Sequence, residues 1–338
     1  MSTLRAMAQR TAKRTYLVTG AAGFIGARFV ESCNERGIET ISVDRENYFQ
    51  SRSEHQGISF GTIVDRDRLL GHISKTGTDA SALPLAFDAV IHLGACTNTM
   101  ELNEAFLTRV NLEYSKALWN YCTEKRIPFI YASSAATYGD GSSGYDDDEK
   151  LIPRLRPLNP YGESKRLFDL WALAEEQAGR KPPSWSGFKF FNVYGFGERH
   201  KNKMASVVLH AYDQIRATGR VRLFKSHREG IADGHQKRDF VFVEDAVRVL
   251  HFALEHPIPR GIFNLGTGHA RTYLDLARAV FAALELPERI DFIDTPVEIR
   301  DRYQYFTEAK MERLRSQGYE RPFTRLEDGV QKYIARLT

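Results

Sequence analysis

The chain has 338 residues, 42% of them hydrophobic, which is enough to bury a full core and fits one large and one small domain. Its 47 lysines and arginines only slightly outnumber its 43 aspartates and glutamates. This small positive charge does not by itself indicate nucleic-acid binding, and it is also compatible with an anionic small-molecule ligand. The three cysteines form no CxxC pair and no apolar run approaches the roughly 18 residues of a membrane-spanning helix, so we expect reduced thiols, no metal site and a soluble cytoplasmic protein.

Short apolar runs rich in β-branched residues alternate with longer amphipathic stretches from Thr15 onward. This alternation is typical of βαβ units and predicts an α/β fold with a Rossmann-type, doubly wound parallel sheet. Residues 1–14 are basic but lack the apolar core of a signal peptide, so they predict a flexible tail. We expect strands at 16–18, 39–43, 58–60, 89–93, 129–133 and 188–191.

Residues 159–177 are predicted to form a helix with a well-defined start. Pro160 suits the first helical turn, and Asn159 can accept a hydrogen bond from the backbone as the cap. The polar, acidic and glycine-rich residues 139–150 before it predict a solvated loop.

The pattern changes after Asn192, with predicted loops at 195–202 and 226–236 and strand-like segments at 239–243 and 262–264. We therefore expect a dinucleotide-binding domain over 15–192 and a smaller C-terminal substrate domain over most of 193–338. Parts of 239–268 are expected to return to the first domain's sheet.

Gly20, Gly23 and Gly26 follow the first predicted strand and open the first predicted helix, with Phe24 and Ile25 between the last two. In this context the first glycine permits a tight turn, the second lets backbone N–H groups approach a pyrophosphate, and the third lets the helix pack on the sheet. The unpaired N–H groups of the helix N-terminus add partial positive charge. These residues predict a dinucleotide site.

Two further segments are expected to complete the dinucleotide site. Asp44 ends the second strand, where a carboxylate can accept a hydrogen bond from a ribose 2′-hydroxyl and favours NAD, whereas Arg45 can pair with the 2′-phosphate of NADP or remain a solvated cation. After the fourth strand, small residues let the chain pass close to the cofactor, and Asn111 in the next helix can brace that loop; the loop residues are Leu93, Gly94, Ala95 and Cys96.

Tyr161 and Lys165 lie at i and i+4, so both side chains share one helix face. A free tyrosine with a pKa near ~10 is a poor base, but a neighbouring ammonium stabilises the phenolate and makes the tyrosine a usable acid/base. Ser133 and Ser134 end the preceding strand, and their hydroxyls are expected to orient a substrate hydroxyl beside the tyrosine. The alternative for the pair is an ordinary surface contact.

These residues resemble those of the extended short-chain dehydrogenase/reductases, in the NAD-dependent epimerase/dehydratase family, from about Thr15 to the C-terminus. The similar segments are YASSAATYG at 131–139, FFNVYG at 190–195, HK at 200–201 with MASV at 204–207, KRDFV at 237–241, FNLGTG at 263–268 and RYQ at 302–304. The third and the last resemble epimerases that invert C6 of an ADP-linked heptose, a precursor of the lipopolysaccharide inner core.

The resemblance implies NADP as the cofactor, with NAD as the alternative. An epimerase of this kind removes a hydride from a secondary alcohol and returns it to the other face of the ketone, so a second acid/base across the pocket is useful. Tyr161 and Lys201 match those two roles, and Val193 matches a position near the nicotinamide. The alternative for Lys201 is a phosphate contact or a solvated loop lysine.

The resemblance also implies substrate contacts from Ser134, Asn192, Lys203, His210, Phe224, Arg238 and Tyr303. A guanidinium can grip a diphosphate bidentately, which supports Arg238; its alternative is a surface ion pair with Asp239. Tyr303 and His210 fit a buried core equally well. The chain departs from the family at Lys203, where a small residue is usual, and in the longer, charged segment 225–236.

The family contains other activities. A dehydratase commonly places an Asp-Glu pair where this chain has Ala135, Ala136 and Thr137, which argues against elimination of water. The activity of a sugar 4-epimerase stays a possible alternative if Lys201 takes no part in catalysis. A separate alternative is a regulatory protein that binds the dinucleotide without catalysing a reaction. The resemblance implies a homo-oligomer, a pentamer, acting on a small nucleotide-sugar without nucleic-acid or membrane partners.

Overall fold

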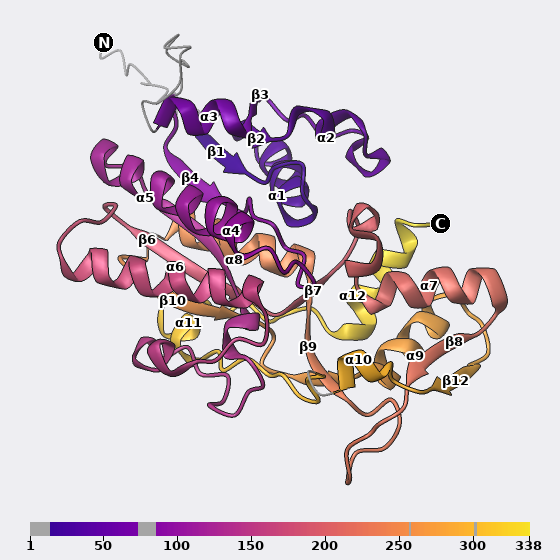
Figure 1. Ribbon diagram of the computed structural model, residues 1–338. Helices are drawn as coiled ribbons and strands as arrows, with labels where there is room; N and C mark the ends of the chain where they lie inside the picture. The colour runs from indigo at the N-terminus through magenta and orange to yellow at the C-terminus, as the bar shows by residue number, and fades with distance from the viewer. Residues whose placement is uncertain (1–13, 74–85, 257, 301–302) are drawn as a thin grey trace, which may run out of the picture.

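The computed structural model describes residues 14–73, 86–256, 258–300 and 303–338. The predicted tail, apart from Arg14, and Arg302 of the RYQ segment lie outside the described residues. Within the described ranges, seven strands form one parallel sheet in the order β10-β6-β5-β4-β1-β2-β3 (Figure 1). The strands are β1 (Thr15–Thr19), β2 (Glu39–Asp44), β3 (Thr62–Asp65), β4 (Ala89–His92), β5 (Phe129–Ser134), β6 (Trp185–Phe190) and β10 (Ile262–Leu265).

Helices cover both faces of this sheet, so its central strands are almost entirely buried. α1 packs against α8, and α3 packs against α5. The helices of this unit are α1 (Phe24–Glu35), α2 (Glu46–Gln50), α3 (Arg66–Ile73), α4 (Glu104–Leu107), α5 (Tyr114–Lys125), α6 (Pro160–Gln177), α8 (Val243–Glu255) and α11 (Glu312–Ser316). The short helical turns in the described parts of both units are η1 (Ser53–His55), η2 (Thr108–Glu113), η3 (Ala135–Tyr138), η4 (Glu149–Arg154) and η5 (Arg199–Met204).

A second unit gathers at the right of Figure 1, where α7, α9, β8 and β12 lie away from α5 and α6. Its strands form two small sheets, β11-β9-β7 and β12-β8. The elements are β7 (Asn192–Tyr194), β8 (Val221–Phe224), β9 (Lys237–Phe242), β11 (Ala270–Thr272), β12 (Ile290–Ile293), α7 (Val207–Thr218), α9 (Tyr273–Ala283), α10 (Val297–Arg300) and α12 (Leu326–Ala335).

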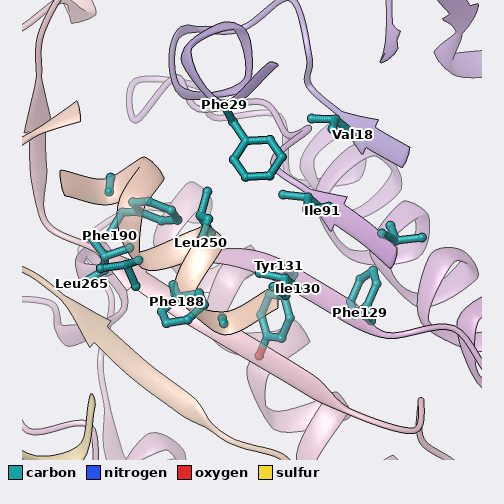
Figure 2. Close-up of a cluster of buried hydrophobic side chains, with 14 of the residues drawn as sticks. Val18, Phe29, Ile91, Phe129, Ile130, Tyr131, Phe188, Phe190, Leu250 and Leu265 are labelled. Carbon is teal, nitrogen blue, oxygen red and sulfur yellow. The ribbon is translucent and has the colours of Figure 1, made fainter. Parts of the chain in front are cut away.

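Each unit has its own hydrophobic core. In the first, side chains of β1, β4, β5, β6 and β10 cluster with Phe29 of α1 and Leu250 of α8 (Figure 2). The second core is built mainly from α7, α9 and α12 with the strands beside them. Phe24, the first residue of α1, packs into this second core, and Ile25 packs against both. The start of α1 therefore lies where the two cores meet.

The expected α/β class and parallel sheet are confirmed, and the third strand is the clearest error in the element predictions. We expected it at 58–60, but β3 is Thr62–Asp65. Phe60 is instead buried against the rings of Phe49 and His55, each 4.9 Å away between centroids. Because β3 is an edge strand with Thr62 and Ile63 exposed, it lacks the continuous apolar run used to find buried strands.

The segment 239–268 divides between the two units. β10 joins the large parallel sheet beside β6, as expected, whereas β9 pairs with β7 and β11 in a separate sheet. The β6 strand begins at Trp185, three residues before the predicted start, and ends before Phe191.

The loop 139–150 is only partly the solvated segment that its polar composition predicted, because residues 140, 142, 143, 148 and 150 are exposed while others are buried. Tyr145 and Asp147 are buried, and the Asp147 carboxylate accepts a 2.7 Å hydrogen bond from the Asn264 backbone. Glu149 forms a 2.7 Å ion pair with Arg260. The carboxylates of Asp147 and Glu149 therefore attach this loop to the backbone of β10 instead of pointing into solvent.

Candidate active site

Gly20 and Gly26 are required by close backbone approaches at the start of α1, whereas a Cβ on Gly23 would lie 3.0 Å from the Gly20 oxygen. Gly20 has a φ of +68°, and a Cβ there would lie 2.6 Å from the Gly94 nitrogen. A Cβ on Gly26 would lie 2.0 Å from the Gly20 oxygen. α1 has neither a side-chain cap nor an acidic residue in its first turn, so its positive end is open to an anion.

The Asp44 side chain holds the glycine loop by accepting a hydrogen bond from the backbone of that loop. Its carboxylate accepts hydrogen bonds from the N–H groups of Ala22, at 3.2 Å, and Arg45, at 2.9 Å. Burial raises the pKa of Asp44. The Arg45 guanidinium is exposed and lies 5.7 Å from the centroid of the Tyr48 ring.

Arg52 is a second cation at this end of the site, and the sequence analysis missed it. Its guanidinium donates to the Ala22 carbonyl and lies 4.6 Å from the centroid of the Tyr48 ring. Burial lowers the pKa of Arg52, and the charge of Asp44 opposes that shift. Arg52 lies eight residues beyond the end of β2, so neither strand pattern nor glycine spacing pointed to it.

Asn111 braces the loop after β4, as expected. Its side-chain oxygen accepts from the Cys96 N–H at 2.8 Å, and its amide nitrogen donates to the Cys96 carbonyl and to the Ser164 hydroxyl, at 3.1 and 3.0 Å. Gly94 in the same loop donates to the Thr19 hydroxyl at 3.2 Å. Because Ser164 lies on α6, Asn111 ties the loop after β4 to the helix that carries Tyr161 and Lys165.

The start of α6 is confirmed. Asn159 accepts a 2.8 Å hydrogen bond from the Gly162 N–H, and Pro160 is the first helical residue. This places Tyr161 in the first turn, and Lys165 follows one turn later. Both side chains are buried at the carboxyl end of β5.

The Lys165 ammonium donates a 2.8 Å hydrogen bond to the Ala132 carbonyl. Burial lowers the pKa of Lys165 to about 8, against the opposing charge of Asp169. Burial raises the pKa of Tyr161, and a hydrogen bond with Ser134 opposes the rise. A proton leaving Tyr161 therefore depends on nearby hydrogen bonding and positive charge.

The two serines at the end of β5 have different surroundings, which corrects the expectation that both face a substrate. Ser134 faces Tyr161, and its oxygen accepts from the Ala136 N–H at 3.1 Å. Ser133 is buried and donates to Asp169 at 2.8 Å. Ser133 therefore belongs to the interior because side chains alternate across a strand.

A fully buried ion pair that sequence analysis missed lies beneath α6. The Lys189 ammonium is 2.7 Å from the Asp169 carboxylate and donates at 2.8 Å to the Thr137 hydroxyl. Asp169 also accepts from the Tyr131 hydroxyl at 3.0 Å. Asp169 is four residues after Lys165, so this network supports the turn that carries the lysine.

Lys201 lies in η5, half-buried, with its ammonium 5.4 Å from the centroid of the Phe24 ring. Burial lowers its pKa, and the charge of Glu198 opposes that effect. Thr99 in the loop after β4 lies 4.0 Å from the Met204 sulfur, so η5 contacts the cofactor loop. The alternative of a solvated loop lysine is therefore wrong, while that of a phosphate contact stays open.

The predicted substrate residues Phe224, Arg238 and Tyr303 come together. The buried Arg238 guanidinium lies 5.6 Å from the ring centroids of both Tyr273 and Tyr303, and Tyr303 packs edge-on against Phe224. The ion-pair alternative for Arg238 is wrong, because the buried Asp239 carboxylate accepts three backbone N–H groups and one hydroxyl.

The other predicted substrate residues are less closely assembled. Asn192 is exposed at the start of β7, and Lys203 is exposed on η5. Val193, which is predicted near the nicotinamide rather than the substrate, packs against both cores. His210 lies half-buried on α7; among the described residues, no hydrogen bond, ion pair or ring contact joins its side chain to the Arg238 cluster.

The long segment 225–236 folds toward this cluster. The His227 N–H donates to the Tyr305 hydroxyl at 3.0 Å, and the Arg228 guanidinium lies 5.7 Å from the centroid of the same ring. A cavity of about 480 Å³ opens here, lined by side chains that include Asp140, Tyr145, Arg228, Tyr303 and Tyr305. The segment that departs from the family therefore lines a cavity shared with Tyr303.

Neither a membrane helix nor a metal cluster is found in the part of the chain that the structure describes. None of its helices is long and apolar enough to cross a membrane. No group of three or more histidine, cysteine, aspartate or glutamate side chains there is placed to hold a metal ion.

The fold, the glycine loop and the Tyr161/Lys165 pair define a dinucleotide-dependent enzyme of the extended short-chain type. The NAD dependent epimerase/dehydratase family matches residues 16–266, and the chain belongs to that family.

Several relatives of this chain share the name of a single enzyme within that family. The ADP-L-glycero-D-manno-heptose-6-epimerase of Fusobacterium nucleatum is 44% identical over 94% of this chain and 96% of its own length. The enzyme of the same name from Nitratidesulfovibrio vulgaris is 46% identical over 94% and 96%. The crystal structure of that epimerase from Helicobacter pylori matches with a TM-score of 0.78 and 26% identity, covering 96% of each chain. The resemblance to epimerases of an ADP-linked heptose is confirmed.

Proposed function

We propose that this protein interconverts ADP-D-glycero- and ADP-L-glycero-β-D-manno-heptose at C6, with NADP as a cofactor that is regenerated in each turnover. The observation that carries the proposal is Lys201, a half-buried lysine beside the start of α1, on an element different from the one that carries Tyr161. A dehydrogenase needs one acid/base, whereas inversion leaves the oxygen in a different position at the second hydride transfer.

In one direction the Tyr161 phenolate accepts the C6 hydroxyl proton while the C6 hydride leaves, which oxidises the alcohol to a ketone. When bound, the dinucleotide would supply the hydride acceptor and donor for this exchange. After the ketone presents its other face, Lys201 donates the proton that the reduced oxygen requires. Ser134 orients the oxygen beside Tyr161, and the Lys165 ammonium stabilises the phenolate.

Two arginines support NADP over NAD. Arg45 and Arg52 both lie against Tyr48 near the Asp44 carboxylate, where a 2′-phosphate needs cationic partners. We expect Arg52→Ala to weaken NADP more than NAD in a fluorescence titration. Equal weakening of both cofactors contradicts the assignment.

Thr137 adds an argument against a dehydratase. It stands where that activity requires an acid or a base, and its buried hydroxyl is engaged with Lys189 and with the Ser134 carbonyl. By resemblance, we further propose a cytoplasmic homo-oligomer, a pentamer, that supplies a lipopolysaccharide core precursor; sedimentation of the purified protein tests the oligomer.

The deciding experiment is incubation of the purified protein with ADP-D-glycero-β-D-manno-heptose, without added cofactor, while the C6 configuration is followed by NMR. Conversion to an equilibrium mixture, without accumulation of reduced cofactor, supports the epimerase and a retained dinucleotide. No conversion, even with NADP and NAD supplied, refutes the heptose assignment and directs the search to UDP-, GDP- and dTDP-hexoses.

A further inference from the structure

The turn that carries Lys201 is closed at its base by one buried carboxylate. Glu198 is fully buried. It accepts hydrogen bonds from the backbone and hydroxyl of Ser206, at 2.6 and 2.5 Å, and from the Gly195 N–H at 3.4 Å. Because a buried carboxylate is stable only when its oxygens are paired, these contacts fix both ends of the segment 195–206.

The closed turn holds an unfavourable backbone conformation beside the lysine. The Lys201 N–H donates at 2.9 Å to the Glu198 carbonyl, and Asn202 follows with φ +48° and ψ −121°. A side chain rarely adopts this conformation unless its surroundings impose it. A second carboxylate, Glu54 of η1, fixes the other side of the turn by accepting from the Arg199 N–H at 3.1 Å.

Glu198 also supplies the negative charge that faces the Lys201 ammonium. Burial raises the pKa of Glu198 and lowers that of Lys201, and each charge opposes the shift of the other. No direct ion pair joins the two among the described residues, so the ammonium keeps its hydrogens for another partner. The Tyr333 hydroxyl of α12 also faces Glu198. Burial, together with the charge of Glu198, raises the pKa of this tyrosine, so the hydroxyl is neutral.

We propose that Glu198 is a positioning residue for Lys201: it closes the turn that holds the lysine over the start of α1 and provides the charge opposite its ammonium. The inference rests on the proposed function only in taking Lys201 as the second acid/base. The Glu198 carboxylate is directed into the turn, where it is fully buried and bonded to Gly195 and Ser206.

The test compares Glu198→Gln with Glu54→Gln, which removes the other carboxylate of the turn. Trace acetylation across a pH series, quantified by mass spectrometry, gives the titration midpoint of Lys201 directly. We expect Glu198→Gln to lower that midpoint by about one pH unit, since the opposite charge is lost. The midpoint in Glu54→Gln, and that of the exposed Lys203 in every variant, should stay at the wild-type value.

Activity gives a second readout. With Glu198→Gln we expect kcat to fall at least tenfold with little change in KM, since the carboxylate is fully buried and not exposed to a ligand. An unchanged Lys201 midpoint in folded Glu198→Gln protein overturns the proposal.

If Glu198→Gln does not fold, Ser206→Ala opens the same contact while keeping the charge. We then expect a several-fold loss of kcat that Ser206→Thr restores, and a wild-type kcat in Ser206→Ala overturns the proposal. Wild-type protein that fails to convert the heptose refutes the proposed function alone, because the acetylation measurement does not require turnover.

Discussion

Two buried lysines flank Asp169, and replacing each by methionine should change stability in opposite directions. Lys165 is buried with its pKa lowered from 10.5 to about 8, so below pH 8, where the amine is charged in both states, folding is penalised by the whole difference between the two pKa values. At about 1.4 kcal/mol per pKa unit, that penalty is about 3 kcal/mol. Replacing the amine leaves the Ala132 carbonyl without its donor, which costs about 1 kcal/mol.

Lys165→Met should therefore raise the free energy of unfolding by about 2 kcal/mol at pH 7 while abolishing activity. The penalty is fully present below pH 8 and disappears as pH rises toward 10.5, because the folded protein binds the proton less tightly than the unfolded chain. The stabilisation should shrink over the same range. Urea unfolding at pH 7, 9 and 10 measures it.

Lys189→Met is the matched control. Lys189 is fully buried and paired at 2.7 Å with Asp169, so its removal leaves an uncompensated carboxylate in the interior. We expect a loss of about 3–5 kcal/mol. Equal destabilisation by both substitutions, or a gain in Lys165→Met that does not change with pH, refutes this account of the two lysines.

Three further outcomes are expected. Tyr161→Phe and Lys201→Met should each lower the epimerisation rate by about 10²–10⁴ while leaving the circular dichroism spectrum unchanged; near-normal rates in Lys201→Met contradict the two-base mechanism. Gly26→Ala should weaken dinucleotide binding more than tenfold in a fluorescence titration, because its Cβ would lie 2.0 Å from the Gly20 oxygen. Asn202→Gly should raise the unfolding free energy by about 1 kcal/mol through relief of its positive φ, and a lower melting temperature argues against that strain.

Local patterns gave reliable predictions where a residue's role depends on its own neighbours in the chain. The glycine run, the Asn159 cap and the i, i+4 spacing of Tyr161 and Lys165 are short-range features, and the structure shows each of them. The edge strand β3 was displaced in the prediction because an edge strand needs no continuous apolar run.

Charged residues were predicted less well because their partners are distant in the sequence. Arg238 and Asp239 are neighbours, yet the first packs on two tyrosine rings and the second accepts N–H groups from residues 267, 268 and 309. The loop 139–150 has a solvated composition, but Asp147 is buried against β10. The composition of a segment indicates that burying its charges would cost free energy. It does not indicate whether a partner distant in the sequence offsets that cost.

The sequence by itself determined the parallel α/β fold, the dinucleotide loop and the helix that pairs Tyr161 with Lys165, because backbone sterics and helix periodicity act over a few residues. Only the tertiary structure decided that Ser133 faces the core, that Asp169 is paired with Lys189, and that Lys201 lies half-buried over Phe24. Those arrangements depend on which strands and turns meet across the two cores, because a buried polar or charged group is stabilised by partners that are distant in the sequence.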